Sequence, residues 1–254
     1  MHMNNNRLPI LDIWVDPVTM DQALSITSTF VEKGEQVHTI FAANPEKNDS
    51  VPKDPLLYNM FKEADLIIPD GIGMVLAAWI LHGKKLQRVP GCELMQRLCA
   101  LAEEKGYKIF IYGAQEEVNK KAVETLRQRH GNIQIVGRSN GYVSEKKMDD
   151  LVEKINASMA QILFVALGSP AQEKWISTYR DRLEHVRVCQ GIGGTLDVIA
   201  GTVRRAPEIY CRLGLEWLFR LIDDPSRIKR QKVLPVFALS ILKQRLLRLA
   251  PFKN

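Results

Sequence analysis

Short apolar runs alternate with helix-like stretches along most of this 254-residue chain, and this alternation limits the possible folds more than any other feature. The runs end at polar or glycine-containing turns, and a helical pattern follows most of these turns. Such alternation predicts an α/β fold with a mainly parallel sheet and helices on both faces. The predicted strands are residues 10–15, 36–43, 65–69, 107–112, 133–137, 162–167 and 186–190.

The segments between these strands carry ordinary start and stop signals for helices. Thr19 is a suitable N-cap for a helix that stops at Gly34. Residues 47–54 are polar and rich in proline, so we predict a loop there. The other predicted helices of this part are residues 55–64, 74–81, 92–105, 116–129 and 144–158.

The composition is that of an ordinary globular protein, with 46% hydrophobic and 25% charged residues. The length suits one large domain, or one domain with an appendage. The longest uncharged apolar stretch, residues 233–242, is shorter than the roughly 18 residues of a spanning helix. The four cysteines show no zinc-site spacing, which favours buried thiols in a reduced, cytoplasmic protein.

Polar residues and glycines follow the predicted strands, at the edge where open α/β sheets bind ligands. The N–H groups of glycine loops and the positive ends of the following helices favour phosphate. These loops together predict a nucleotide-type pocket at the carboxyl edge of the sheet. The residues concerned are Asn44, Asp70, Gly113, Gly141, Gly168, Gln172, Gly193 and Gly194.

Asp70 lies between a short apolar strand and a long apolar helix, in the stretch 67–73 that contains Gly71 and Gly73. Two interpretations are open from these residues. Asp70 is either the N-cap of the following helix or a carboxylate at the mouth of a ligand cleft.

Signatures of several enzyme classes are missing from the sequence. There is no Walker motif and no complete G-x-G-x-x-G, which argues against a kinase-like enzyme or an ordinary dehydrogenase. There is no Asp-x-Asp, the histidines show no ligand spacing, and Ser169 lacks a nucleophile elbow. We therefore predict no metal site and expect carboxylates and arginines to carry the chemistry.

The excess positive charge lies in the last fifth of the chain. Residues 204–254 contain 12 Lys and Arg against 4 Asp and Glu, a net charge of +8, whereas the rest of the chain sums to −2. This asymmetry indicates an anionic partner for the C-terminal part, such as a membrane surface, a phosphate-bearing substrate or a nucleic acid.

Helices are also predicted in this basic part, over residues 208–222, after Asp224-Pro225, and over 236–249. The last of these is basic and amphipathic, which suits either an anionic membrane interface or packing on the domain. Arg227 and Arg230 would share one helix face. A surface ladder of ion pairs at i, i+4 and i+8 is predicted for Arg212, Glu216 and Arg220.

Motifs in the same order along nearly the whole chain resemble those of the WecG/TagA/CpsF glycosyltransferases. They are residues 68–73, 88–91, 168–175, 191–198, 204–207 and 216–221, followed by Pro225, Arg227 and Arg230. The resemblance implies a Rossmann-like core, residues 1–203, and a helical C-terminal appendage, residues 204–254, in a GT-E-like arrangement. The appendage would complete the active site and touch the membrane. Independently of the resemblance, the apolar side of this part could pair subunits into a homo-oligomer.

The resemblance also implies an activity. Family members transfer a sugar from a UDP-sugar to a lipid-diphosphate-linked GlcNAc at the cytoplasmic face of the membrane, with inversion and without a metal or other cofactor. They act in teichoic acid linkage, common antigen and capsule or exopolysaccharide synthesis. The donor sugar stays open between N-acetylmannosamine, its uronic acid, glucuronic acid and glucose.

Site residues carried over from the family fall into three groups. Asp70 matches the proposed catalytic base, with Asn44 beside it and Arg88 and Gln172 in the pocket. The arginines expected to face the diphosphate are Arg220, Arg227 and Arg230. The UDP is expected where Gly193, Gly194 and Asp197 lie. Independently of the family, the glycine loops at the strand ends make Gly113, Gly141, Tyr142 and Gly168 further candidates for nucleotide binding. Two departures, Ala42 for a usual threonine and Glu93 for a usual aspartate, concern donor or acceptor contacts.

Two other function classes compete with this interpretation. An NAD-dependent oxidoreductase would share the sheet, but the complete dinucleotide fingerprint is missing. A nucleic-acid-binding module would use the basic tail, but stacking aromatics are scarce among its basic residues, so we expect no nucleic acid partner.

Overall fold

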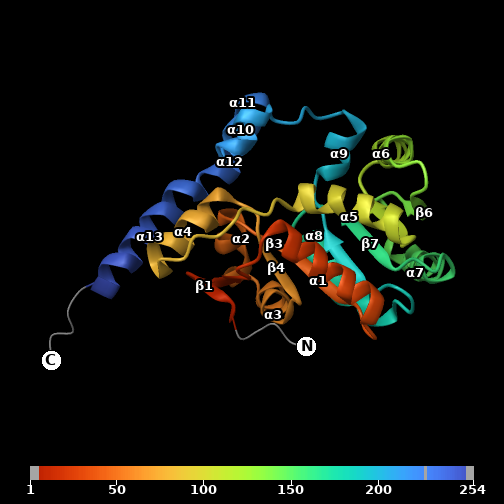
Figure 1. The fold of residues 1–254 in the computed structure, drawn as a ribbon, viewed down its shortest axis with the longest axis horizontal. Helices are drawn as coiled ribbons and strands as arrows, with labels where there is room; N and C mark the ends of the chain where they lie inside the picture. Colours follow the sequence, from red (N-terminus) through yellow and green to blue (C-terminus); the bar gives the residue numbers. More distant parts are fainter. Residues whose placement is uncertain (1–5, 226–227, 250–254) are drawn as a thin grey trace.

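The structure, a computed structural model, describes residues 6–225 and 228–249 (Figure 1). Its centre is a six-stranded sheet in the order β4-β3-β8-β7-β5-β6, with each neighbouring pair parallel. The strands are β3 (His38–Ala43), β4 (Leu66–Pro69), β5 (Lys108–Gly113), β6 (Gln134–Ser139), β7 (Ile162–Ala166) and β8 (Val188–Gly191). The predicted α/β fold with a mainly parallel sheet is therefore confirmed.

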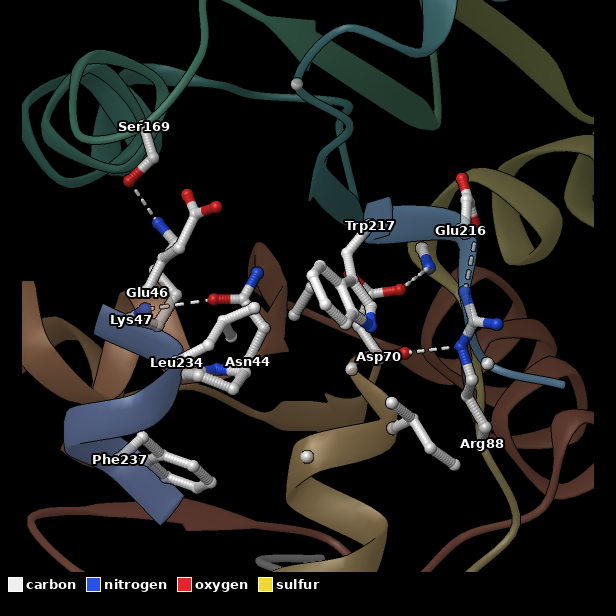
Figure 2. Close-up of a pocket in the computed structure, with 18 of the residues that line it drawn as sticks. Asn44, Glu46, Lys47, Asp70, Arg88, Ser169, Glu216, Trp217, Leu234 and Phe237 are labelled. Carbon is white, nitrogen blue, oxygen red and sulfur yellow. Dashed lines mark hydrogen bonds and ion pairs between the residues drawn. The ribbon is translucent and has the colours of Figure 1, made fainter. Parts of the chain in front are cut away.

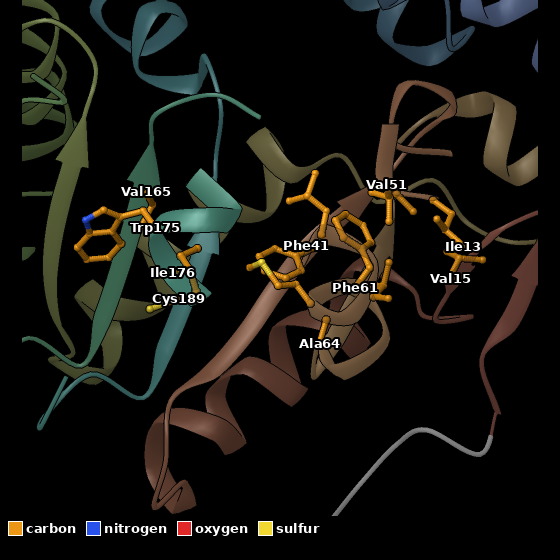
Figure 3. Close-up of a cluster of buried hydrophobic side chains, with 14 of the residues drawn as sticks. Ile13, Val15, Phe41, Val51, Phe61, Ala64, Val165, Trp175, Ile176 and Cys189 are labelled. Carbon is orange, nitrogen blue, oxygen red and sulfur yellow. The ribbon is translucent and has the colours of Figure 1, made fainter. Parts of the chain in front are cut away.

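Helices cover both faces of the sheet because successive strand residues point to opposite sides. In β3, Phe41 and Ala43 join one buried cluster, whereas Ile40 joins the other. Figure 3 shows the first cluster, where the Phe41 and Phe61 rings stack at 5.2 Å. This cluster includes α3 (Pro55–Glu63), α4 (Ile72–His82), α7 (Met148–Ala157) and α8 (Ala171–Tyr179). The second includes α1 (Met20–Lys33), α5 (Gly91–Lys105), α6 (Glu116–Arg129) and α9 (Thr195–Ala200).

The predicted first strand, residues 10–15, is wrong as a single element of the main sheet. The chain turns at Leu11, whose φ of 52° is left-handed, and forms a separate antiparallel hairpin. Its strands are β1 (Leu8–Ile10) and β2 (Ile13–Val15). The apolar residues on either side of the turn still point into the first cluster, which explains why the pattern resembled one strand.

The loop predicted for residues 47–54 is wrong as well. The segment forms α2 (Pro45–Ser50) and a 3-10 helix, η2 (Val51–Lys53). Asn44 caps α2 by accepting a hydrogen bond from the Lys47 N–H at 2.9 Å, and Pro45 occupies the first helical position, where proline is favoured. The polar residue Asn48 is buried, and its Nδ2 donates to the Ile10 carbonyl at 2.6 Å.

The helix predicted over residues 208–222 is broken in two. Gly214 adopts a left-handed φ of 70° and ends the first helical segment. A Cβ at Gly214 would lie 2.8 Å from Cβ of Ile72, so this break also lets the chain approach the start of α4 closely. The C-terminal helices are α10 (Glu208–Arg212), α11 (Glu216–Asp223), α12 (Ile228–Gln231) and α13 (Val233–Leu249).

The helix α13 lies along α4 and α2 at one side of the molecule (Figure 1). Phe237 and Ile241 are buried in the first cluster, and the Arg248 guanidinium donates to the Leu81 carbonyl at 3.0 Å. This is the helix predicted for residues 236–249, and it begins at Val233. Within the described residues, no helix is both long and apolar enough to cross a membrane.

Candidate active site

A pocket of about 710 Å³ lies between the carboxyl ends of β3, β4 and β8 and the C-terminal helices (Figure 2). The strand-end loops contribute Asn44 after β3, Asp70 after β4 and Gly193 after β8. From the other side, α11 contributes Trp217 and α13 contributes Phe237. Segments far apart in the sequence therefore form one cavity at the edge of the sheet where ligands are expected.

Several of the sequence-predicted site residues line this pocket together. They are Asn44, Asp70, Arg88, Gln172, Gly193 and Gly194. The structure does not bring the remaining nucleotide candidates into the same cavity, as far as the described residues outline it. Those are Gly113, Gly141, Tyr142, Gly168 and Asp197.

Asp70 is not the N-cap of the following helix. Gly71 occupies that position, and the described residues give α4 no side-chain cap. The Asp70 carboxylate instead accepts a hydrogen bond from the Gly91 N–H at 3.2 Å. The Asp70 N–H donates to the Ala43 carbonyl at 3.1 Å, which holds the turn against the end of β3. Of the two interpretations of Asp70, the structure supports the carboxylate that lines a cleft.

The glycines beside Asp70 allow the start of α4 to touch the loop after β3. A Cβ at Gly71 would lie 3.2 Å from Cβ of Asn44, and a Cβ at Gly73 would lie 2.8 Å from Cγ of Pro45. These distances are too short for ordinary contacts. Glycine is therefore needed here for the close approach of two protein segments, and that approach sets Asn44 beside Asp70.

A buried hydrogen-bonded network joins the loops at the polar end of the pocket. The Lys47 ammonium donates to Glu173 Oε1 and to the Ser169 hydroxyl. Gln172 Nε2 also donates to Glu173 Oε1, at 3.2 Å, and the Gly193 N–H donates to Gln172 Oε1 at 2.9 Å. The loops after β3, β7 and β8 are thereby held in fixed positions relative to one another.

The ion pair in this network is almost completely buried, since Lys47 is 7% exposed and Glu173 1% exposed. Burial lowers the pKa of Lys47, although the neighbouring Glu173 carboxylate opposes that shift. Glu173 Oε2 is also buried and has no hydrogen-bond partner among the described residues. Loss of either member would leave a buried charge without compensation, which is strongly destabilising.

Arg88 joins the core to the C-terminal helices. Its Nε donates to the Asp70 carbonyl at 2.8 Å, its Nη1 to the Cys211 carbonyl at 3.1 Å, and its Nη2 to Glu216 Oε2 at 2.8 Å. The guanidinium thus contacts the backbone of Asp70 and two C-terminal helices at once. Figure 2 shows its bonds to Asp70 and Glu216. Arg88 lines the pocket, and its hydrogen bonds connect the candidate base to α11.

The predicted ladder of ion pairs is wrong at its first step. The break at Gly214 puts Arg212 and Glu216 on different helices, so the i, i+4 geometry of one continuous helix does not exist. Glu216 pairs with Arg88 instead.

Two of the three arginines expected to face a diphosphate belong to the C-terminal helices. Arg220 belongs to α11, the helix that brings Trp217 to the pocket, and Arg230 belongs to α12, beside the pocket residue Gln231. Arg227 lies outside the described residues. Their role in binding phosphate stays a prediction.

The remaining glycine loops lie at the other half of the sheet edge or behind the pocket. Gly113 ends β5 and Gly141 follows β6. The side chain of the buried Asn119 donates a hydrogen bond to the Gly113 carbonyl at 2.8 Å. Tyr142 is 76% exposed. Gly168 follows β7, and Asp197 lies in the first turn of α9 near Gly194, so both are close to pocket residues. Nucleotide binding by these residues is untested.

Sequence reasoning missed the buried ion pair and the C-terminal contacts. Lys47 was placed in a loop, and Ser169 and Glu173 were noted within a family motif but given no role. Trp217 lies within the family motif at residues 216–221 and was likewise given no role. One signal was available, because Glu173 follows directly after Gln172 in a motif at a strand end.

Comparison with known proteins agrees with this geometry. A family model described as "Glycosyl transferase WecG/TagA/CpsF family" matches residues 8–251. The chain belongs to this glycosyltransferase family. It is 37% identical over 205 residues to a Bacillus subtilis (strain 168) protein, covering 81% of this chain and 79% of the relative. It is 33% identical over 241 residues to a Staphylococcus aureus (strain MRSA252) protein, covering 94% of each.

Both relatives carry the name N-acetylglucosaminyldiphosphoundecaprenol N-acetyl-beta-D-mannosaminyltransferase. The present chain is thus a glycosyltransferase, and its pocket is the candidate active site. Among the described residues, no group of three or more His, Cys, Asp or Glu side chains is arranged to hold a metal ion.

Proposed function

We propose that this glycosyltransferase moves N-acetylmannosamine from UDP to GlcNAc-diphospho-undecaprenol, in cell-surface polymer or teichoic acid linkage synthesis. The position of Asp70 carries the proposal, because its carboxylate lies in a cavity bounded by both the strand-end loops and the C-terminal helices. The names of the relatives support this choice of sugar and acceptor.

In the proposed reaction, Asp70 accepts the proton of the acceptor GlcNAc hydroxyl. That oxygen attacks the anomeric carbon from the face opposite the UDP, the new C–O bond forms, and the bond to the UDP oxygen breaks with inversion. A positioned general base contributes roughly 10²–10⁴-fold to the rate. The Gly91 N–H orients the Asp70 carboxylate for this role.

Departure of UDP requires stabilisation of the charge that develops on the diphosphate. We assign this to the N–H group of Gly194, in the loop after β8, and to Arg220, Arg227 and Arg230. Arginine suits a diphosphate because its planar fork makes paired hydrogen bonds. Stabilisation of the departing diphosphate therefore needs the core and the C-terminal helices together.

We further propose that the outer side of α13 rests on the inner face of the cytoplasmic membrane. Val236, Leu239 and Leu246 are more than half exposed on this helix, and Lys243 and Arg245 are exposed among them. An apolar face mixed with cations suits the interface of an anionic bilayer. This contact would bring the pocket to a membrane-bound acceptor.

The test is turnover of a panel of UDP-sugars with a synthetic GlcNAc-diphospho-lipid. The panel contains UDP-N-acetylmannosamine, its uronic acid, UDP-glucuronic acid, UDP-N-acetylglucosamine and UDP-glucose. We expect transfer from UDP-N-acetylmannosamine. Transfer from a different donor would overturn the sugar assignment, and release of UDP without a disaccharide-lipid product would overturn the function.

A further inference from the structure

The pocket extends beyond its polar end into an apolar groove between α4 and α13. Leu76 and Ile80 line it from α4, one helical turn apart. The α13 residues that line it recur at the spacing of a single helix face and are Leu234, Phe237, Ala238, Ile241 and Leu242. Figure 2 shows Leu234 and Phe237 from α13 beside the polar pocket residues. The groove is continuous with the cavity that contains Asp70.

The chemistry of the groove differs from that of the polar end. Among the described pocket residues on α4 and α13, none is charged, whereas the polar end contains Lys47 and Glu173. A nucleotide, a sugar or a diphosphate would leave its polar groups without partners on such a surface. The groove therefore fits an apolar ligand segment joined directly to a polar reacting group.

The groove also has buried and exposed parts. Phe237 and Ile241 are almost fully buried, whereas Leu76 and Leu242 are 50% and 52% exposed. Each half-exposed leucine comes from a different helix, and both line the pocket. The groove is thus open along its outer edge, from which a long chain can continue out of the protein.

We propose that this groove holds the first isoprene units of the acceptor's polyprenyl chain. The proposal rests on the proposed function, which supplies a polyprenyl diphosphate as the acceptor. The lipid leaves the diphosphate along α4 and α13, and its distal part stays in the bilayer. The acceptor is then bound at both ends, with its GlcNAc at Asp70 and its proximal chain between the helices.

The experiment compares two soluble acceptors without vesicles or detergent, so that attachment to a membrane plays no part. One is GlcNAc-diphosphate bearing a farnesyl chain, and the other bears a methyl group. Calorimetry gives the Kd of each acceptor, and turnover is measured in parallel. We expect wild-type protein to bind the farnesyl acceptor at least roughly tenfold more tightly, the scale of lost apolar contacts in a pocket.

Leu76→Gln and Leu242→Gln should bring the ratio of the two Kd values toward one. The matched control is Leu56→Gln on α3, because Leu56 is 46% exposed and is not one of the described residues that line the pocket. That control should keep the wild-type ratio. Half-exposed positions were chosen so that the substitutions leave the core intact.

Equal Kd values for the two acceptors in the wild-type protein would overturn the groove assignment. So would a rise in the Kd of the UDP-sugar, rather than of the farnesyl acceptor, in the Leu76 and Leu242 variants, because the groove would then bind the donor. Chain-length-dependent binding without any sugar transfer would instead contradict the proposed function and leave the groove supported.

Discussion

The strand-end loops and the C-terminal helices border the same pocket, but different forces hold them in place. The loops are fixed by buried contacts, above all the Lys47–Glu173 pair and the hydrogen bond from Gly193 to Gln172. The helices α10 to α12 are short, and several apolar side chains on them or directly after them are more than half exposed, namely Ile209, Leu213, Ile222 and Ile228. Arg88 and the close approach of Gly214 to Ile72 connect them to the core.

This difference suggests that the strand-end loops and the C-terminal helices have separate roles in the proposed reaction. The candidate base belongs to the part held by buried contacts, whereas the positive charge proposed to face the diphosphate comes from a part with fewer buried contacts. The two regions should therefore be separable by experiment. Because α13 buries Phe237 and Ile241 in the first cluster, we expect the core alone to fold with lower stability.

Removal of residues 204–254 should have the largest effect. The truncated protein should show no detectable transfer, because the arginines assigned to the diphosphate are gone, while it still binds UDP through the strand-end loops. A transfer assay measures the activity, circular dichroism the fold, and a UDP titration the binding of the nucleotide. Full activity of the truncated protein would exclude the C-terminal helices from the active site.

Asp70→Asn should have the next largest effect. We expect kcat to decrease by roughly 10²–10⁴-fold, the range for loss of a general base. The amide is similar in shape, so donor KM and thermal stability should stay near the wild-type values. Turnover close to that of wild type in a folded variant would mean that another group takes the proton.

Glu216→Gln should weaken the connection between the regions. The variant removes the charge partner of Arg88. We expect about a tenfold decrease in transfer, equivalent to about 1.4 kcal/mol, and faster proteolytic cleavage between residues 204 and 215. Asp223→Asn, an exposed carboxylate on the same helix, serves as the control. Unchanged cleavage would show that this ion pair does not hold the helices in place.

Lys47→Met should act mainly on the stability of the fold and less on the reaction itself. Glu173 would be left buried without its counter-charge, and the free energy of unfolding should fall by about 3–5 kcal/mol in denaturant titration. Lys47→Met combined with Glu173→Gln should recover part of this loss. The exposed Lys53, paired with Asp49, provides the control, because Lys53→Met should change stability by less than about 1 kcal/mol. Equal effects at Lys47 and Lys53 would contradict a stabilising role of the buried network.

The sheet and its ligand edge could be predicted because they depend on local patterns. Apolar runs followed by glycine turns identify the strand ends, and the strand ends led to Asn44, Asp70 and Gly193. The parallel topology follows from the alternation of strands with helices.

The contacts that hold the site together could not be predicted, because their partners are distant in sequence. Glu173 is 126 positions from Lys47, and Glu216 is 128 positions from Arg88. Locally, a segment with Lys47 and nearby prolines has the composition of a loop, and only tertiary packing buries it. The turn at Leu11 was missed for a related reason, since a leucine with positive φ has no sequence signal.

The central claim is that arginines of the C-terminal helices, rather than a divalent metal, neutralise the UDP diphosphate beside Asp70. The most direct test is the initial rate of acceptor-dependent UDP release by the full-length protein, with and without EDTA. We predict equal rates and no stimulation by added Mg²⁺. A rate that falls with EDTA and is restored by Mg²⁺ would contradict the claim.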